Sequence, residues 1–75
     1  MPRIPRITGE AAVKAFKKLG YELDHITGSH HILKRDGVDG HLSIPCHKGQ
    51  MVGIGLLKSQ ILAAGITVER FIELL

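Results

Sequence analysis

Two adjacent histidines follow a glycine and a serine in the middle of the chain, in the segment Gly28-Ser29-His30-His31. Histidine is the side chain whose unperturbed pKa lies closest to neutral pH, so it takes up and releases protons under physiological conditions. The chain carries ten Lys and Arg residues against seven Asp and Glu residues, a net charge of +3. This balance favours an anionic partner such as nucleic acid. The segment therefore indicates proton transfer on an anionic substrate.

Hydrophobic periodicity and turn residues predict the elements that position these histidines. Thr8 is a suitable N-cap for a first helix, and Gly20 is suited to end it. Residues 36–40 combine Asp and Gly and predict a turn between two strands. The expected elements are helices over residues 9–19, 54–64 and 68–75 and strands over residues 21–27, 29–35 and 41–46. This order predicts an α+β fold in which helices cover one face of an antiparallel sheet and solvent covers the other.

Strand alternation places the two histidines on opposite faces of the sheet. If Leu33 packs in the core, His31 lies on the packed side, whereas His30 and Lys34 lie on the open face. A slip of one residue in the strand register would invert this assignment. The residues expected on the open face are His30, Lys34, His41 and, if the third strand continues far enough, His47.

Such a face has the groups that metal-independent RNA cleavage requires. The RNA 2′-hydroxyl attacks the adjacent phosphate once a base removes its proton, and an acid protonates the leaving 5′-oxygen. An imidazole acting as general acid or base contributes about 100- to 10,000-fold in rate. Lys34 or Lys48 would stabilise the charge on the phosphorane. Gly28 would allow a close backbone approach to a phosphate, and Ser29 would donate a hydrogen bond to it.

Other classes of protein are excluded by composition. Cys46 is the single cysteine, which rules out a disulfide framework and a cysteine-rich zinc module. The histidines and carboxylates lack the spacing of a metal site, so we predict no metal and no cofactor, and Cys46 is expected in the core. No apolar run approaches the roughly 20 residues of a transmembrane helix, and no signal peptide is recognised. We expect a cytoplasmic protein with no membrane contact.

Two other functions remain open from the residues alone. The first is a non-catalytic module that binds double-stranded RNA, although only Lys48 and Lys58 lie near the start of the second helix. The three aromatic residues all fit core positions, so no platform for stacking single-stranded bases is predicted. The second is a protein-interaction domain in which the apolar face of residues 68–75 binds a partner.

The chain resembles the HicA (YcfA-like) family of toxin–antitoxin mRNA interferases over nearly its whole length. The central match is Gly28-Ser29-His30-His31-Ile32, which follows a predicted strand. The other matching segments are Lys18-Leu19-Gly20-Tyr21-Glu22-Leu23, Leu42-Ser43-Ile44-Pro45-Cys46-His47 and Gly65-Ile66-Thr67. A Gly-Ser-His motif with an Ile-Pro-x-His strand downstream is specific for so short a domain.

The resemblance implies a single domain over residues 1–75 with the α-β-β-β-α order of a double-stranded-RNA-binding domain and a short extra C-terminal helix. It implies an endoribonuclease toxin that cleaves mRNA and inhibits translation. It also implies a HicB-like antitoxin that covers the active histidine. In the family the histidine after Gly-Ser is catalytic, which here is His30, and His31 is its structural neighbour. The residues expected to bind the substrate are Gly28, Ser29, Lys34, His47 and Lys48.

Overall fold

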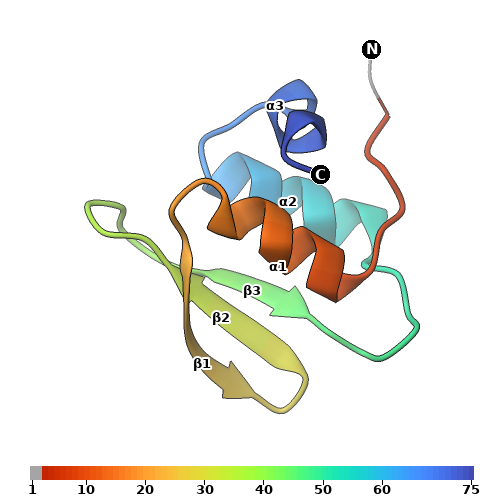
Figure 1. The fold of residues 1–75 in the computed structure, drawn as a ribbon, viewed down its shortest axis with the longest axis horizontal. Helices are drawn as coiled ribbons and strands as arrows, with labels where there is room; N and C mark the ends of the chain where they lie inside the picture. Colours follow the sequence, from red (N-terminus) through yellow and green to blue (C-terminus); the bar gives the residue numbers. More distant parts are fainter. Residues whose placement is uncertain (1–2) are drawn as a thin grey trace.

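The structure is a computed structural model that describes residues 3–75; residues 1–2 of the expected domain lie outside the described residues. One helix, three strands and two further helices follow along the chain (Figure 1). They are α1 (Gly9–Lys17), β1 (Glu22–Thr27), β2 (His30–Lys34), β3 (Leu42–Pro45), α2 (Ile54–Ala63) and α3 (Val68–Glu73). The α+β, double-stranded-RNA-binding-domain-like fold is thereby confirmed. The predicted elements were too long by one or two residues at one or both ends, where helices and strands fray.

The three strands form one antiparallel sheet in the order β1-β2-β3. Helices α1 and α2 both lie on one face of this sheet and pack against β3 (Figure 1). Strand β1 lies at the opposite edge, and all six of its residues are exposed. The helices therefore cover the β3 side of the sheet, while the β1–β2 hairpin extends beyond them.

The strand register separates the two histidines as the alternation predicted. Leu33 lies opposite Leu42, and both are buried in the core beneath the helices. His31 lies opposite the buried Ile44 and shares that packed face. His30 lies on the other face and is exposed. The inverted register, which would have reversed these faces, does not occur.

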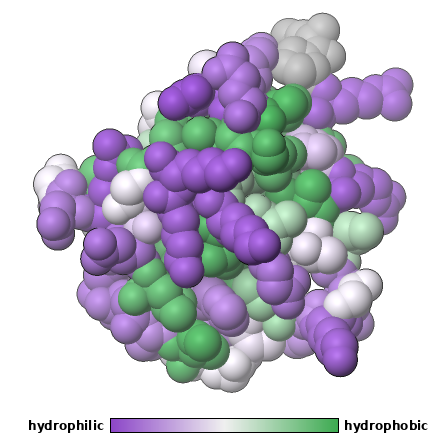
Figure 2. All heavy atoms as spheres, in the orientation of Figure 1, coloured by the Kyte–Doolittle hydropathy of each residue, from purple (hydrophilic) through white to green (hydrophobic). Residues whose placement is uncertain are grey.

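Some apolar side chains depart from a simple alternation of buried and exposed faces. Ile32 lies on the open face but is only 8% exposed, and its cross-strand neighbours are His25 and Ser43. Leu23 and Ile26 of β1 are 40% and 52% exposed, because the helices do not reach that edge. Figure 2 shows apolar patches among the mostly hydrophilic side chains on one face of the molecule.

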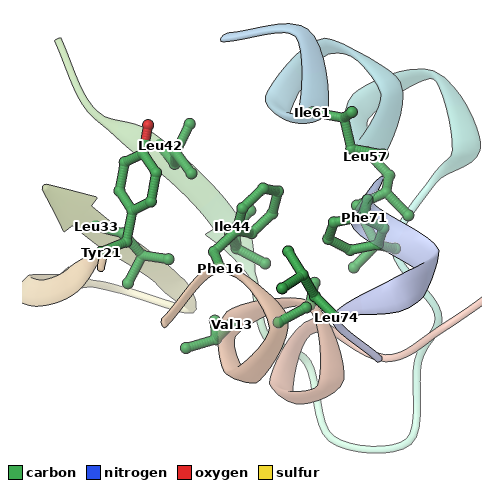
Figure 3. Packing of buried hydrophobic residues seen from close by; sticks show 13 residues of the cluster. Val13, Phe16, Tyr21, Leu33, Leu42, Ile44, Leu57, Ile61, Phe71 and Leu74 are labelled. Atoms are coloured by element: carbon green, nitrogen blue, oxygen red, sulfur yellow. The ribbon is translucent and has the colours of Figure 1, made fainter. Parts of the chain in front are cut away.

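Phe16 of α1 lies at the centre of the core and contacts an aromatic residue in each half of the chain. Its ring centroid is 6.1 Å from that of Tyr21 in an edge-on arrangement and 5.0 Å from that of Phe71 in α3 (Figure 3). All three aromatic residues are buried, as predicted. The largest fully buried side chains are Phe16, Phe71, Leu33, Leu42, Ile44, Leu57 and Ile61. Helix α3 is thus part of the core.

Strand β3 forms the edge of the sheet next to α2. Pro45, which has no N–H to donate to a ladder, is the last residue of this edge strand, as its chemistry predicted. The backbone N–H of Ser43 donates to Oε1 of Gln60 in α2 at 3.0 Å. A helix side chain therefore accepts a hydrogen bond from the free edge of β3, whereas no side chain among residues 3–75 does so at the free edge of β1.

Candidate active site at the β1–β2 turn

A two-residue turn, Gly28-Ser29, joins β1 to β2. Thr27 and His30 pair across the base of the turn. Gly28 has a φ of +60°, and glycine at the first central position is the preference of type II′ hairpin turns. The predicted second strand begins one residue earlier, at Ser29, which lies outside the β1–β2 ladder because both turn residues of such a hairpin are unpaired with β1. The Gly-Ser pair is therefore the turn that presents His30.

His30 is the first residue of β2 and lies on the open face of the sheet. Its side chain is exposed, and its cross-strand neighbours are Thr27 and Pro45. Neither neighbour carries a charge or a long side chain. The imidazole is consequently accessible to a large substrate from the side of the sheet that the helices leave open.

His47 lies at the same turn, although it comes 17 positions after His30 in the chain. The backbone N–H of Cys46 donates to the carbonyl oxygen of Ser29 at 2.7 Å, which extends the pairing of β2 and β3 beyond His30. The Oγ of Ser29 then lies 3.0 Å from Nε2 of His47, within hydrogen-bond distance. The sequence suggested His47 for this face but gave no sign of its pairing with Ser29.

The segment that carries His47 is fixed by close packing against the start of α1. Gly9 is buried, and a Cβ at this position would overlap the carbonyl oxygen of Pro45 and lie 2.8 Å from Sγ of Cys46. The N–H of Val52 also donates to the carbonyl oxygen of Ile7 at 2.8 Å. Sequence reasoning missed Gly9, and the only signal was a glycine directly after the N-cap of a helix.

Lys34 shares the open face with His30 but lies at the other end of β2. Lys34 comes four positions after His30, which corresponds to about 13 Å along the strand. Its Nζ is 3.6 Å from Oδ2 of Asp24, a residue at the irregularity in the β1 ladder. Nδ1 of His25 lies 2.6 Å from the same oxygen. Hydrogen bonding to His25 lowers the pKa of Asp24; desolvation opposes this in part, and the charge of Lys34 lowers the pKa further.

The other candidate residues divide between the two ends of the sheet. Lys48 is exposed and follows His47 directly, so it lies at the turn end. His41 is exposed but precedes β3, whose first residue pairs with Leu33, so it lies at the opposite end. A surface hollow near Gly20, Glu22 and Arg35 is also at that opposite end and does not include His30. The structure therefore gathers Gly28, Ser29, His30, His47 and Lys48 and leaves Lys34 apart.

A sequence model of the HicA toxin of bacterial toxin–antitoxin systems matches residues 9–66. The match covers more than half of the chain. This protein belongs to the HicA toxin family. No curated protein matches the chain significantly. The family is generally one of ribonucleases, and as the toxin of a two-component system it implies a cognate antitoxin.

The HicA match covers the whole turn cluster and stops before α3. It begins at Gly9, the residue packed against Pro45, and ends at Ile66. Helix α3, with the fully buried Phe71, lies outside it. In this HicA family member the last helix is nevertheless part of the hydrophobic core.

Cys46 sits beside the turn cluster of this HicA family member as a packing residue. Its side chain is half-buried against the core, and Sγ–H donates to the carbonyl oxygen of Ile44 at 3.6 Å. Burial raises the pKa of the thiol, and the charge of Glu10 raises it further. A thiol with a raised pKa is a poor nucleophile. Cys46 was expected in the core; it is instead partly buried and packs against the edge of the core.

Among residues 3–75, no three His, Cys, Asp or Glu side chains lie close enough together to hold a metal ion. No helix in the described part of the chain has the length and hydropathy needed to cross a membrane.

Proposed function

We propose that this HicA family member is an endoribonuclease that cleaves mRNA, inhibits translation and uses His30 as a general acid or base. The observation that carries the proposal is the exposed imidazole of His30 at the tight Gly28-Ser29 turn, on the face of the sheet that the helices leave open. A general acid or base must reach the proton it transfers, and an accessible imidazole on a rigid strand meets that condition.

The cleavage itself needs only groups that the RNA and the protein supply. The 2′-hydroxyl of the RNA is the nucleophile, so no water and no metal ion is required for the first step. The space beside Gly28 is open, because no heavy atom lies within 4 Å of the place a Cβ would take. A phosphate of the RNA can therefore approach the backbone there. Ser29 and His47, which contact each other at the turn that presents His30, provide polar hydrogen atoms, and Lys48 provides a positive charge. These residues form the contact surface for the scissile phosphate.

Lys34 binds a different part of the same RNA. Its separation of about 13 Å from His30 along the strand exceeds the reach of its side chain to the scissile phosphate. Neighbouring phosphates of a nucleic acid backbone are separated by several ångströms, so a lysine at this distance contacts a phosphate further along. Such contacts are electrostatic and weaken as the salt concentration rises.

The partner of the toxin is a HicB-like antitoxin that covers His30. The imidazole lies on an open sheet face without any cover from the described residues, so a second protein can occlude it without rearranging the fold. Binding of the antitoxin would then exclude RNA by competition for the same face.

Purified protein and a single-stranded RNA of defined sequence test the proposal. We expect cleavage by the wild-type protein, undiminished by EDTA, and loss of cleavage by at least about 100-fold in His30→Ala. Circular dichroism should show that the variant is folded, and His41→Ala is the matched control at the opposite end of the sheet. Full cleavage by a folded His30→Ala protein would overturn the assignment, and dependence on a divalent ion would indicate a metal site instead. Binding of double-stranded RNA without cleavage by either protein would favour the non-catalytic module.

A further inference from the structure

A second imidazole, that of His47, is held at the turn that presents His30. Its Nε2 is 3.0 Å from Oγ of Ser29, and Ser29 is the residue directly before His30. We propose that His47 is the second proton-transfer residue of the RNA-cleavage reaction and that Ser29 is a positioning residue that holds its ring. This inference rests on the proposed endoribonuclease function.

The reaction needs two proton transfers at different oxygens of the same phosphate. A base takes the proton of the 2′-hydroxyl as the bond from O2′ to phosphorus forms. An acid gives a proton to O5′ as the bond from phosphorus to O5′ breaks. The products are a 2′,3′-cyclic phosphate and a 5′-hydroxyl. A neutral imidazole as base and an imidazolium as acid together supply both proton transfers. A single histidine supplies only one of them in one cleavage event.

The other histidines have no such contact with the residues of the His30 turn. His31 faces the helices and is half-buried opposite Ile44. His25 is hydrogen-bonded to Asp24, and its neighbour in the ladder is Ile32, not His30. His41 lies at the other end of β3. Of the five histidines of the chain, His47 is therefore the one that the described contacts join to the His30 turn.

The contact with Ser29 suits a ring that changes its protonation state. A hydroxyl group both donates and accepts, so it donates to Nε2 when that nitrogen is unprotonated and accepts from it when it carries hydrogen. The hydrogen bond can therefore persist through the catalytic cycle. No residue in the described range 3–75 contacts Nδ1 of His47 by a hydrogen bond, which leaves that nitrogen for the substrate. The ring is thus fixed at one nitrogen and available at the other.

Packing around the segment limits the movement of the pair. The carbonyl oxygen of Ser29 accepts from the N–H of Cys46 at 2.7 Å, directly before His47. Gly9 of α1 lies against Pro45 and Cys46 on the other side. Two strands and a helix therefore set the position of His47 relative to His30, as an acid–base pair requires.

The test compares single-turnover cleavage rates at saturating protein, so that differences in RNA affinity do not enter. We expect His47→Gln to lower the rate constant by about 100-fold or more. RNA binding should fall far less than the rate constant does, because His47 is only one of several residues that contact the RNA. Plotted against pH, the wild-type rate should be bell-shaped and the His47→Gln rate should keep only one limb. His41→Gln, an exposed histidine at the opposite end of the sheet, is the matched control and should retain the wild-type rate and profile.

Ser29 provides the test of positioning. Ser29→Ala should lower the rate less than His47→Gln does and should keep a bell-shaped profile, because the acid–base pair remains. Ser29→Thr, which keeps the hydroxyl, should restore the rate. In Ser29→Ala/His47→Gln the serine change should lower the rate less than it does in the wild-type protein.

Several results would overturn the role of His47. They are a wild-type rate in folded His47→Gln, an unchanged bell-shaped profile, or a loss of RNA affinity that accounts for the whole loss of cleavage. The proposed function fails differently: the wild-type protein would not cleave RNA, or His30→Ala would cleave it fully. A His30-dependent cleavage that is indifferent to His47 would leave the nuclease assignment intact and reject only this inference.

Discussion

Gly9, the first residue of α1, lies directly against the carbonyl oxygen of Pro45, the last residue of β3. The contact is close enough that only a hydrogen atom fits in place of a side chain. We predict that Gly9→Ala destabilises the protein by about 1–3 kcal/mol, as overpacking of a tight contact does. It should also lower RNA cleavage in the protein that remains folded, since the displaced segment carries His47. Urea unfolding and the cleavage rate measure the two effects.

Gly55→Ala is the matched control for Gly9→Ala. Gly55 lies in α2, and a Cβ there would have no heavy atom within 4 Å. Because alanine favours a helix over glycine, this change should stabilise the protein by about 0.5–1 kcal/mol. If Gly9→Ala lowers the free energy of unfolding while Gly55→Ala raises it, the loss of stability at Gly9 comes from its contact with Pro45. Equal stability of Gly9→Ala and wild type would contradict the predicted clash.

The Gly28 turn yields a prediction that separates backbone strain from a role in catalysis. Gly28 and Gly37 have φ values of +60° and +79°, and neither has a heavy atom within 4 Å of its missing Cβ. Alanine at either position should cost about 1–2 kcal/mol, because L-residues disfavour positive φ. Only Gly28→Ala should also reduce RNA cleavage, since Gly37 lies at the opposite end of the sheet. A similar loss of cleavage in both variants, measured well below their melting temperatures, would reject the special role of Gly28.

Asp24 gives a prediction for pH. Its pKa is lowered from 3.8, chiefly by the hydrogen bond with His25 and also by the charge of Lys34. A lowered pKa in the folded state stabilises the fold at pH values above 3.8, and this contribution disappears as the pH falls through the folded-state pKa. NMR titration of the carboxyl group should show a larger rise in its pKa in His25→Gln than in Lys34→Met. A rise that is larger in Lys34→Met would show that the ion pair, and not the hydrogen bond, dominates.

The strand faces were predictable from the sequence because burial imposes a two-residue period on a half-covered sheet. Leu33, Leu42 and Ile44 had to share a buried face, which placed His30 on the other one. The same logic gave Lys34 the correct face. Alternation predicts which face a residue lies on. It does not predict whether two residues on that face, such as Lys34 and His30, are close enough to contact the same phosphate.

The pairing of Ser29 with His47 was beyond sequence reasoning for a different reason. It depends on β3 pairing with β2 up to Cys46, which is a long-range contact that local preference does not set. The predicted strand over residues 29–35 includes Ser29, whereas in the structure Ser29 is the second residue of the turn. The close fit of Gly9 against Pro45 is likewise a three-dimensional contact, and a glycine at a helix start gives no hint of its neighbour.

The last prediction concerns α3, which lies outside the HicA match yet contributes a fully buried aromatic residue. The ring centroids of Phe71 and Phe16 are 5.0 Å apart in the centre of the core. Phe71→Ala should destabilise the protein by about 3–5 kcal/mol, the range for removing a buried phenylalanine side chain. Ile72→Ala, the next residue of the same helix and 37% exposed, should change stability by about 0.5 kcal/mol or less. Thermal unfolding followed by circular dichroism compares the two. If Phe71→Ala melted within a few degrees of Ile72→Ala, α3 would be an appendage and not a part of the folding unit.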